Sequence, residues 1–296
     1  MITEERRVLR FMKNKVFNII LVLVFLAGLS LLLYPTIADA YNSYLQSRII
    51  LSYSEQVDAM ESAVYEAEMA EAKAYNARLL EREHPYKLTE ELEEQYWQTL
   101  DISKIMAYVE IPSINVTLPI AHGTEKDTLE DYVGHLKWTS LLVGGESTHS
   151  VISGHRGLPS SELFTNIDRL EIGDVFYIHV LGQTLEYWVD HISVVLPTEY
   201  NNLGIVEGRD YVTLMTCTPY GINSHRLLVR GIRIDRSLIP ETEDIRIKNE
   251  IQSVDLMVLI PVILVILSCL VFAFLALPGG GPKKKKTRKG KQHGKE

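Results

Sequence analysis

The chain has 296 residues, of which 46% are hydrophobic and 23% are charged, and its formal net charge is −8. Its 18 glycines and 11 prolines are ordinary fractions, which excludes a collagen-like or wholly disordered chain. The charge is segregated, since residues 1–15 carry +3 and residues 278–296 carry +7, which leaves −18 for the middle. A nucleic-acid partner is disfavoured, because the acidic body would repel a phosphate backbone.

Two apolar runs account for this segregation. Val16–Tyr34 is an uncharged run of 19 residues, and Leu256–Leu277 is a run of 22. Both are close to the length of about 20 helical residues that crosses a hydrocarbon layer. Lys and Arg flank the outer end of each run, which predicts a two-pass protein of the cell membrane with both termini in the cytoplasm and the middle outside. The basic tail then acts as a topology determinant that also contacts membrane lipid.

The first apolar run has one feature of a secretory signal peptide. Ala38-Asp39-Ala40 offers the small-x-small pattern at which such peptides are cleaved. The apolar core is, however, longer than the roughly 7–15 residues usual in signal peptides. We therefore favour an uncleaved anchor over a removed leader.

The region after the first run has a helical pattern. Apolar residues recur at steps of three and four through Ala38–Glu83, so we expect one long helix whose apolar stripe packs on the protein's own domain. Pro85 ends this pattern. A short second helix is predicted over Thr89–Leu100, with Thr89 as a candidate N-cap.

From Ile105 onward the helical periodicity ends and the sequence consists of short β-like runs. Leu181-Gly182-Gln183 is typical of a hairpin turn, and Ser161–Leu170 is typical of a helical turn. The predicted strands are Met106–Ile111, Val116–Ile120, Val151–Ser153, Val175–Val180, Thr184–Val195, Tyr211–Thr216 and Arg226–Ile234. Many short strands with few helices between them indicate an antiparallel barrel or sandwich. Glu241–Ser253 is interpreted as a polar connector back to the membrane.

The outward-facing portion holds a single thiol. Cys217 ends a predicted strand just before Pro219, whereas Cys269 lies inside the second apolar run, so membrane depth argues against a disulfide between them. A thiol at a strand end is held stiffly and remains reachable. Its ordinary pKa of about 8.5 means that it needs a cationic neighbour to be substantially ionised at neutral pH.

Two residues are candidates for activating this thiol. Arg226 belongs to the strand expected to return beside Cys217, and His155 follows a β-like run between Gly154 and Gly157. A Cys–His pair with a fixed cation suits acyl transfer, because the imidazole exchanges the proton and the guanidinium stabilises the oxyanion. Sequence position alone does not bring the three together, so a Cys217 that merely packs in a tethered, non-enzymatic module stays an alternative at this point.

Other chemistries find less support in the sequence. The remaining outward histidines have no tight ligand spacing, and with one outward thiol a structural zinc site is disfavoured. Asp127, Glu130 and Asp131 fit no calcium-loop motif. The usual phosphate-binding glycine loops are missing from the sequence, and we expect no cofactor.

The run Thr213-Leu214-Met215-Thr216-Cys217 resembles the Thr-Leu-x-Thr-Cys signature of the sortase family. Arg226 and His155 stand at matching places, and the resemblance covers roughly Ile105–Asp235. It implies a mainly β fold, an eight-stranded sortase-type β-barrel. It also implies Cys217 as the nucleophile, His155 as its acid/base partner and Arg226 as the group that stabilises the oxyanion or substrate.

Further segments are similar to class C, the pilin-polymerising branch of the sortases. These are Gly154-His155-Arg156-Gly157-Leu158-Pro159, the stretch Thr218–Gly231, the long outer helix and the second apolar run. The resemblance implies a Gram-positive enzyme that cleaves an LPxTG-like sorting signal between Thr and Gly and joins pilin subunits through lysine isopeptide bonds. A sortase that anchors surface proteins to a cell-wall peptidoglycan amine is the alternative. A hydrolytic cysteine protease differs only in letting water resolve the thioester.

One expected feature of class C departs from the pattern. The class usually has a lid before the barrel with an Asp-Pro-aromatic motif, and the nearest triplet here is His84-Pro85-Tyr86. Histidine replaces the acid that would pair with arginine, so the lid is expected to be degenerate or absent.

The predicted organisation has seven parts. They are a basic cytoplasmic segment (1–15), a transmembrane helix (16–34), an outer helical region (35–104), the catalytic barrel (105–236), a connector (237–255), a second transmembrane helix (256–277) and a basic cytoplasmic tail (278–296).

Overall fold

The computed structural model describes residues 2–234 together with residues 265 and 268. Residues 34–234 lie in a compact unit that is separate from the first 33 residues. The helices are α1 (Ile2–Asp58), α2 (Ser62–Leu80), α3 (Glu90–Gln98) and α4 (Lys126–Asp131), with short 3-10 turns at Pro112–Ile114, Ile167–Arg169 and Asn201–Leu203. The strands are β1 (Ala107–Ile111), β2 (Val116–His122), β3 (Val133–His135), β4 (Thr148–Ser153), β5 (Val175–Val180), β6 (Gln183–Val195), β7 (Asp210–Thr218) and β8 (His225–Arg233).

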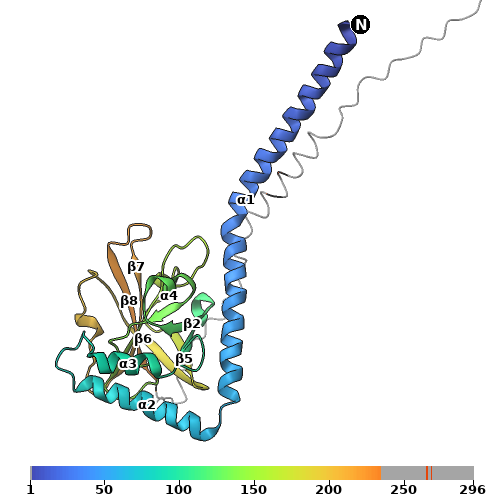
Figure 1. Cartoon of the computed structure of the whole chain (residues 1–296). Helices are drawn as coiled ribbons and strands as arrows, with labels where there is room; N and C mark the ends of the chain where they lie inside the picture. Colours follow the sequence, from blue (N-terminus) through green and yellow to red (C-terminus); the bar gives the residue numbers. More distant parts are fainter. Residues whose placement is uncertain (1, 235–264, 266–267, 269–296) are drawn as a thin grey trace, which may run out of the picture. The chain divides into compact units, whose positions relative to one another are not determined.

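The strands close into a barrel in the order β1-β2-β3-β4-β7-β8-β6-β5 (Figure 1). The eight-stranded barrel implied by the sortase resemblance is therefore confirmed. The antiparallel arrangement expected from the strand pattern is wrong, because β2 pairs with β3, and β4 with β7, in parallel. In both cases a long connection separates the strands, and a chain that crosses over before pairing returns in the same direction.

The strand predictions are correct in place and differ mainly at the ends. Val175–Val180 matches β5, and most other bounds move by one to three residues. Leu181 and Gly182 both have positive φ, 47° and 70°, so the predicted hairpin turns on two left-handed residues. β3 was not predicted, because its three residues are too few to show an alternating pattern.

The inside and outside of the barrel differ in character along β7 and β8. Val212 and Leu214 of β7 point into the core with Leu227 and Val229 of β8, and all four are buried. Successive side chains of a strand point to opposite faces. Cys217 therefore lies on the outer face, where it is half-buried.

The predicted single helix over Ala38–Glu83 is wrong. α1 runs without interruption from Ile2 to Asp58, and α2 starts at Ser62 after a break in which Glu61 is extended. No Gly or Pro marks this break in the sequence. It is set by tertiary packing, because Val57 packs beside Ile105 while Met60 and Tyr65 pack against the main core.

The middle of α1, Val16–Tyr34, is apolar and uncharged. Within the described residues, Ile20–Asp58 is the helical stretch long and apolar enough to cross a membrane. The predicted boundary between residues 34 and 35 falls inside this continuous helix, which includes Pro35. The predicted connector and second transmembrane helix lie outside the described residues, apart from 265 and 268.

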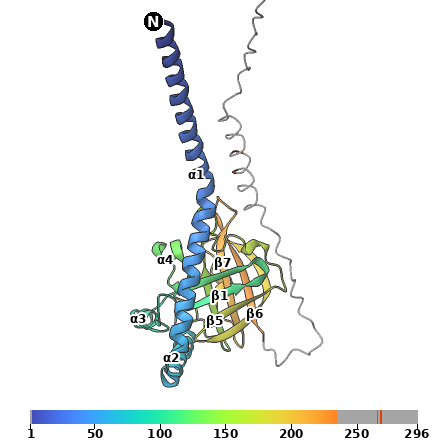
Figure 2. The same ribbon diagram turned by 90° about the vertical axis from the view of Figure 1, so that its right-hand side faces the viewer.

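The second half of α1 runs along the outside of the barrel in both views (Figures 1 and 2). Tyr53 and Val57 of the predicted stripe are buried against the barrel, as expected. The Tyr53 hydroxyl donates to the Met106 carbonyl and accepts from the Leu181 amide. Tyr41, also in the predicted stripe, is 61% exposed, so the stripe is only partly covered by the protein's own domain.

Helices α2 and α3 lie side by side on another part of the barrel (Figure 1). Thr89 caps α3 by accepting from the Leu92 amide, which confirms the predicted N-cap. Tyr75 of α2 and Tyr96 of α3 are fully buried. The Tyr75 hydroxyl donates to the Lys137 carbonyl, and the Tyr96 hydroxyl donates to the His135 carbonyl. The predicted helical turn Ser161–Leu170 shrinks to the 3-10 turn Ile167–Arg169.

Candidate active site

Cys217 and Arg226 are neighbours across the β7–β8 pair. They are direct partners in the antiparallel register, between the pairs Thr216↔Leu227 and Thr218↔His225. Directly opposed residues point to the same face, with Cβ atoms about 4.5–5.5 Å apart. The sheet therefore brings together two residues that the sequence separates by a loop.

His155 reaches the same place from the other side of β7. The parallel β4–β7 register ends at Ser153↔Met215. The Gly154 amide then donates to the Met215 carbonyl at 3.0 Å, and the Thr216 hydroxyl donates to the Gly154 carbonyl at 2.8 Å. Continuing this register by two more residues, through Gly154 and Thr216, would set His155 level with Cys217, on the side of β7 opposite to Arg226.

Beyond the strand ends, the loops that follow His155 and Cys217 touch each other. The Arg156 guanidinium lies over the Tyr220 ring, 5.7 Å from its centroid. Gly157 has a φ of +78°, and a Cβ there would lie 2.9 Å from Tyr220 Cε2. Glycine is thus needed at position 157 both for the backbone conformation and for this close approach.

The three candidate residues are neighbours without being hydrogen-bonded to one another. Arg226 Nη1 donates to the carbonyls of Asn223, at 3.4 Å, and His225, at 3.1 Å. Within the described chain, no hydrogen bond links the Cys217 thiol to His155 or Arg226. His155 contributes its backbone carbonyl to a bond with the Phe164 amide. All three side chains are half-buried, so they are both positioned and reachable.

A cluster of buried and partly buried apolar side chains extends from the neighbourhood of Cys217 along the outer face of the barrel. Met215, two residues before Cys217, and Leu228, two residues after Arg226, pack in one cluster. The other members of this cluster are Val151, Leu203, Leu136, Trp138 and Val195.

The triplet His84-Pro85-Tyr86 contacts the same apolar cluster through the Tyr86 ring. The Tyr86 ring packs edge-on against Trp138, with centroids 5.3 Å apart, and against Tyr200 at 5.7 Å. The His84 carbonyl accepts from the Lys87 amide in a tight turn. The hydrogen bonds and ring contacts of the triplet thus go to residues other than Cys217 in the part of the chain described.

Two buried histidines were not singled out by the sequence pattern. His149, in β4, bonds the Gly204 carbonyl and the Thr213 hydroxyl, both at 2.8 Å. Burial lowers its pKa to about 4. His135, in β3, bonds Tyr96 and the Ser140 carbonyl, and burial lowers its pKa to about 3. Both act as neutral hydrogen-bonding links inside the fold.

Comparison with known proteins gives consistent matches. The sortase-domain family model matches residues 109–234. A sortase A of Bacillus anthracis is 25% identical over 221 residues, which cover 74% of this chain and 95% of that protein. Among solved structures, sortase C1 of Streptococcus agalactiae is 44% identical with a TM-score of 0.61, covering 64% of this chain and 98% of the other. Sortase C-1 of Actinomyces oris is 48% identical with a TM-score of 0.56, covering 58% and 99%.

Proposed function

Since the chain belongs to the sortase family, whose members are cysteine transpeptidases, we propose that Cys217, His155 and Arg226 are its catalytic residues. The observation that carries this assignment is the register around β7. Arg226 is the cross-strand partner of Cys217, and the β4–β7 ladder, which ends two residues before His155, supports a position for His155 on the other side of the same cysteine. These positions supply a nucleophile, an acid/base and a fixed cation at one strand end.

In the proposed reaction, the Cys217 thiolate attacks the threonine carbonyl of an LPxTG-like sorting signal. Arg226 donates hydrogen bonds to the oxyanion of the tetrahedral intermediate. The Thr–Gly C–N bond then breaks, and His155 in its charged form gives its proton to the departing glycine amine. A thioester to Cys217 remains.

The second half of the reaction reverses the roles. A lysine amine of an acceptor protein attacks the thioester carbonyl, and neutral His155 takes the proton that the amine loses. The C–S bond breaks, which returns the Cys217 thiolate and leaves an isopeptide bond. No cofactor enters either half.

We propose pilin subunits as the substrates and acceptors. Several similar solved structures are class C sortases. One of them is described as sortase C1 of a pilus island, and a Streptococcus pneumoniae sortase C, 45% identical, is described in terms of pilin substrate specificity. The apolar cluster beside Cys217 supports docking of the apolar residues of a sorting signal.

We also propose that the enzyme is held at the outer face of the cell membrane by two spans. The apolar length of α1 supports the first span. Leu256–Leu277 is the second, followed by the basic tail. The acidic body would then face outward with the catalytic barrel.

The experiment uses the full chain in detergent, a protein ending in an LPxTG-like signal and a pilin that carries surface lysines. Mass spectrometry should find an isopeptide bond between the signal's threonine and a lysine, and hydroxylamine should release the thioester intermediate. A parallel reaction adds a peptidoglycan peptide with a free amine, and transfer of the threonine only to that amine would replace pilin by the alternative acceptor. If only hydrolysis occurred, the transpeptidase proposal for these substrates would fail.

A further inference from the structure

Helix α1 presents three polar side chains to the barrel unit on one face. Asp39, Asn42 and Gln46 are spaced by three and four residues, so they lie one above the other along the helix. Each makes a hydrogen bond to the backbone of a segment that is distant in sequence. These are specific contacts between side chains and main chain, set on an otherwise regular helix.

Two of the three bonds go to the loop that follows His155. Asn42 Nδ2 donates to the Ser160 carbonyl at 2.8 Å. Asp39 Oδ1 accepts from the Glu162 amide, also at 2.8 Å. The helix therefore holds this loop on both sides of Ser161.

The loop is tied back to His155 by its own hydrogen bonds. The Phe164 amide donates to the His155 carbonyl at 3.1 Å, and Leu158 forms a β-bridge with Ser161. The Gly157 amide donates to the Thr165 hydroxyl at 3.1 Å. A shift of Ser160–Glu162 would thus be carried to the backbone of His155.

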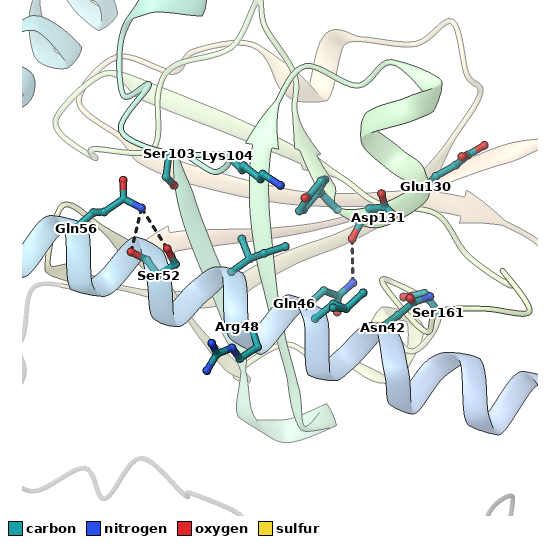
Figure 3. Close-up of a pocket in the computed structure, with 13 residues that line it drawn as sticks. Asn42, Gln46, Arg48, Ser52, Gln56, Ser103, Lys104, Glu130, Asp131 and Ser161 are labelled. Atoms are coloured by element: carbon teal, nitrogen blue, oxygen red, sulfur yellow. Dashed lines mark hydrogen bonds between the residues drawn. The ribbon is translucent and has the colours of Figure 1, made fainter.

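The two hydrogen bonds between helix and loop lie at the edge of a cavity. A cavity of about 760 Å³ lies between α1 and the barrel. Asn42, Gln46 and Ser161 line it, and Figure 3 shows Asn42 beside Ser161 while Gln46 points to Asp131. The hydrogen bonds of Asp39 and Asn42 thus join the helix to the loop next to this open space.

We propose that Asp39 and Asn42 are positioning residues for His155. The proposal rests on the acid/base role given to His155 above. By fixing Ser160–Glu162, the two side chains hold the imidazole within reach of Cys217, and a misplacement of about 1 Å in such a group can lower the rate by about 10²-fold. The catalytic geometry would then depend on the helix that also carries the membrane-spanning stretch.

Isosteric variants of the full chain in detergent test the proposal. Asn42→Asp keeps the shape but cannot donate, so kcat should fall by about tenfold with little change in KM. Asp39→Leu removes the acceptor and should have a similar effect, whereas Asp39→Asn keeps an acceptor oxygen and should restore most of the rate. Gln46→Glu is the matched control. It removes the same kind of bond from the same helix face, but to the Asp131 carbonyl instead of the His155 loop, so kcat should stay within about twofold.

A double-mutant cycle separates positioning from general destabilisation. In a His155→Ala background, Asn42→Asp should have no further effect on thioester formation measured in a single turnover. An equal loss in both backgrounds would overturn the positioning role. Hydrogen exchange of the Phe164 amide should rise in Asn42→Asp and stay unchanged in Gln46→Glu, and unchanged exchange in both would also overturn it.

Failure of the proposed function would look different. If His155→Ala alone left thioester formation unchanged, the acid/base role would fail, and the positioning proposal would fail with it. The hydrogen-exchange data would in that case still show whether Asn42 holds the loop Ser160–Glu162. The contact would then be structural and would have no effect on catalysis.

Discussion

The two histidines near the ends of β4 have opposite surroundings. His149, near the start of the strand, is almost fully buried and both of its ring nitrogens are hydrogen-bonded. A carbonyl only accepts, so Nδ1 donates to Gly204 and Nε2 accepts from the Thr213 hydroxyl. His155, just past the other end, is half-buried and uses its backbone in the described contacts. An imidazole whose two nitrogens are both hydrogen-bonded, such as that of His149, joins parts of the fold. The proposed role of His155 needs a ring nitrogen that can exchange a proton.

The same contrast divides the arginines of β8. Arg230 is paired with Asp190 by two hydrogen bonds and lies over the Tyr211 ring, 4.2 Å from its centroid. Arg226, four residues earlier on the same face, donates to loop carbonyls at the strand end beside Cys217. Within the described residues, Arg226, at the strand end, bonds only backbone carbonyls and can turn toward a substrate in the proposed reaction. Arg230, in the middle of the strand, is held by its ion pair with Asp190.

The largest expected effect belongs to Cys217→Ala. Without the sulfur no thioester can form, so transfer should fall to background while the fold is kept, because a half-buried methyl group replaces the thiol without loss of core packing. Transfer would be followed by mass spectrometry and folding by thermal unfolding. Retained transfer in a folded variant would exclude the proposed nucleophile.

Arg226→Ala should come next, with a loss of about 10²–10³ in kcat, the range found for removal of an oxyanion donor. Arg226→Lys should recover only part of the rate, because an ammonium lacks the planar fork of a guanidinium. Arg230→Ala is the matched control, since Arg230 lies on the same strand as Arg226 but pairs with Asp190 of β6, so its loss should lower stability more than kcat. If the two alanine variants lost activity equally, a special role for Arg226 would be contradicted.

The buried histidines should make stability sensitive to acid. Burial holds the pKa of His149 at about 4 in the folded chain, below the ordinary value of about 6.5. Below pH 6.5 the unfolded chain therefore binds more protons than the folded chain. The free energy of unfolding should fall as pH drops toward 4, by about 3 kcal/mol from this residue, and stay level above pH 6.5.

Urea unfolding of the parent and of His149→Gln at a series of pH values tests this effect. The variant cannot titrate at position 149, so its stability should fall less steeply with acid, although burial of His135 leaves part of the slope in place. Identical slopes in the two proteins would show that His149 is not held neutral by the fold.

The sequence predicted the barrel strands well where periodicity is local. β5 and the Leu181-Gly182 turn follow from alternation and turn chemistry alone. The parallel β4–β7 pairing does not, because nothing local in Ser153 and Met215 specifies that these distant residues meet. The break between α1 and α2 was not predicted for the same reason. It follows from packing around Ile105, and no helix-breaking residue marks it in the sequence.

The candidate site was found through one short motif. Cys217 stood out as a thiol at a strand end, and the Thr-Leu-x-Thr-Cys pattern added Arg226 and His155. Asp39 and Asn42 carry no such signal, because a polar residue on a helix face is ordinary until the structure shows a backbone group opposite it. His149 likewise differs from His155 only in its surroundings.

The smallest expected effect concerns a third histidine, His84, which lies in the triplet His84-Pro85-Tyr86, where the sequence predicts a degenerate or absent lid. His84→Ala and Tyr86→Ala should each leave the rate at which a small thiol reagent labels Cys217 within about twofold of the parent. The reason is that Tyr86 packs against Trp138 and Tyr200, and His84 cannot form the carboxylate–arginine contact of an acidic lid residue. Labelling of the full chain in detergent, followed by mass spectrometry, gives the rates, with Cys217→Ala as the blank. A large acceleration in either variant would show that the triplet covers the thiol, and His84 would then join the residues that control access to the site.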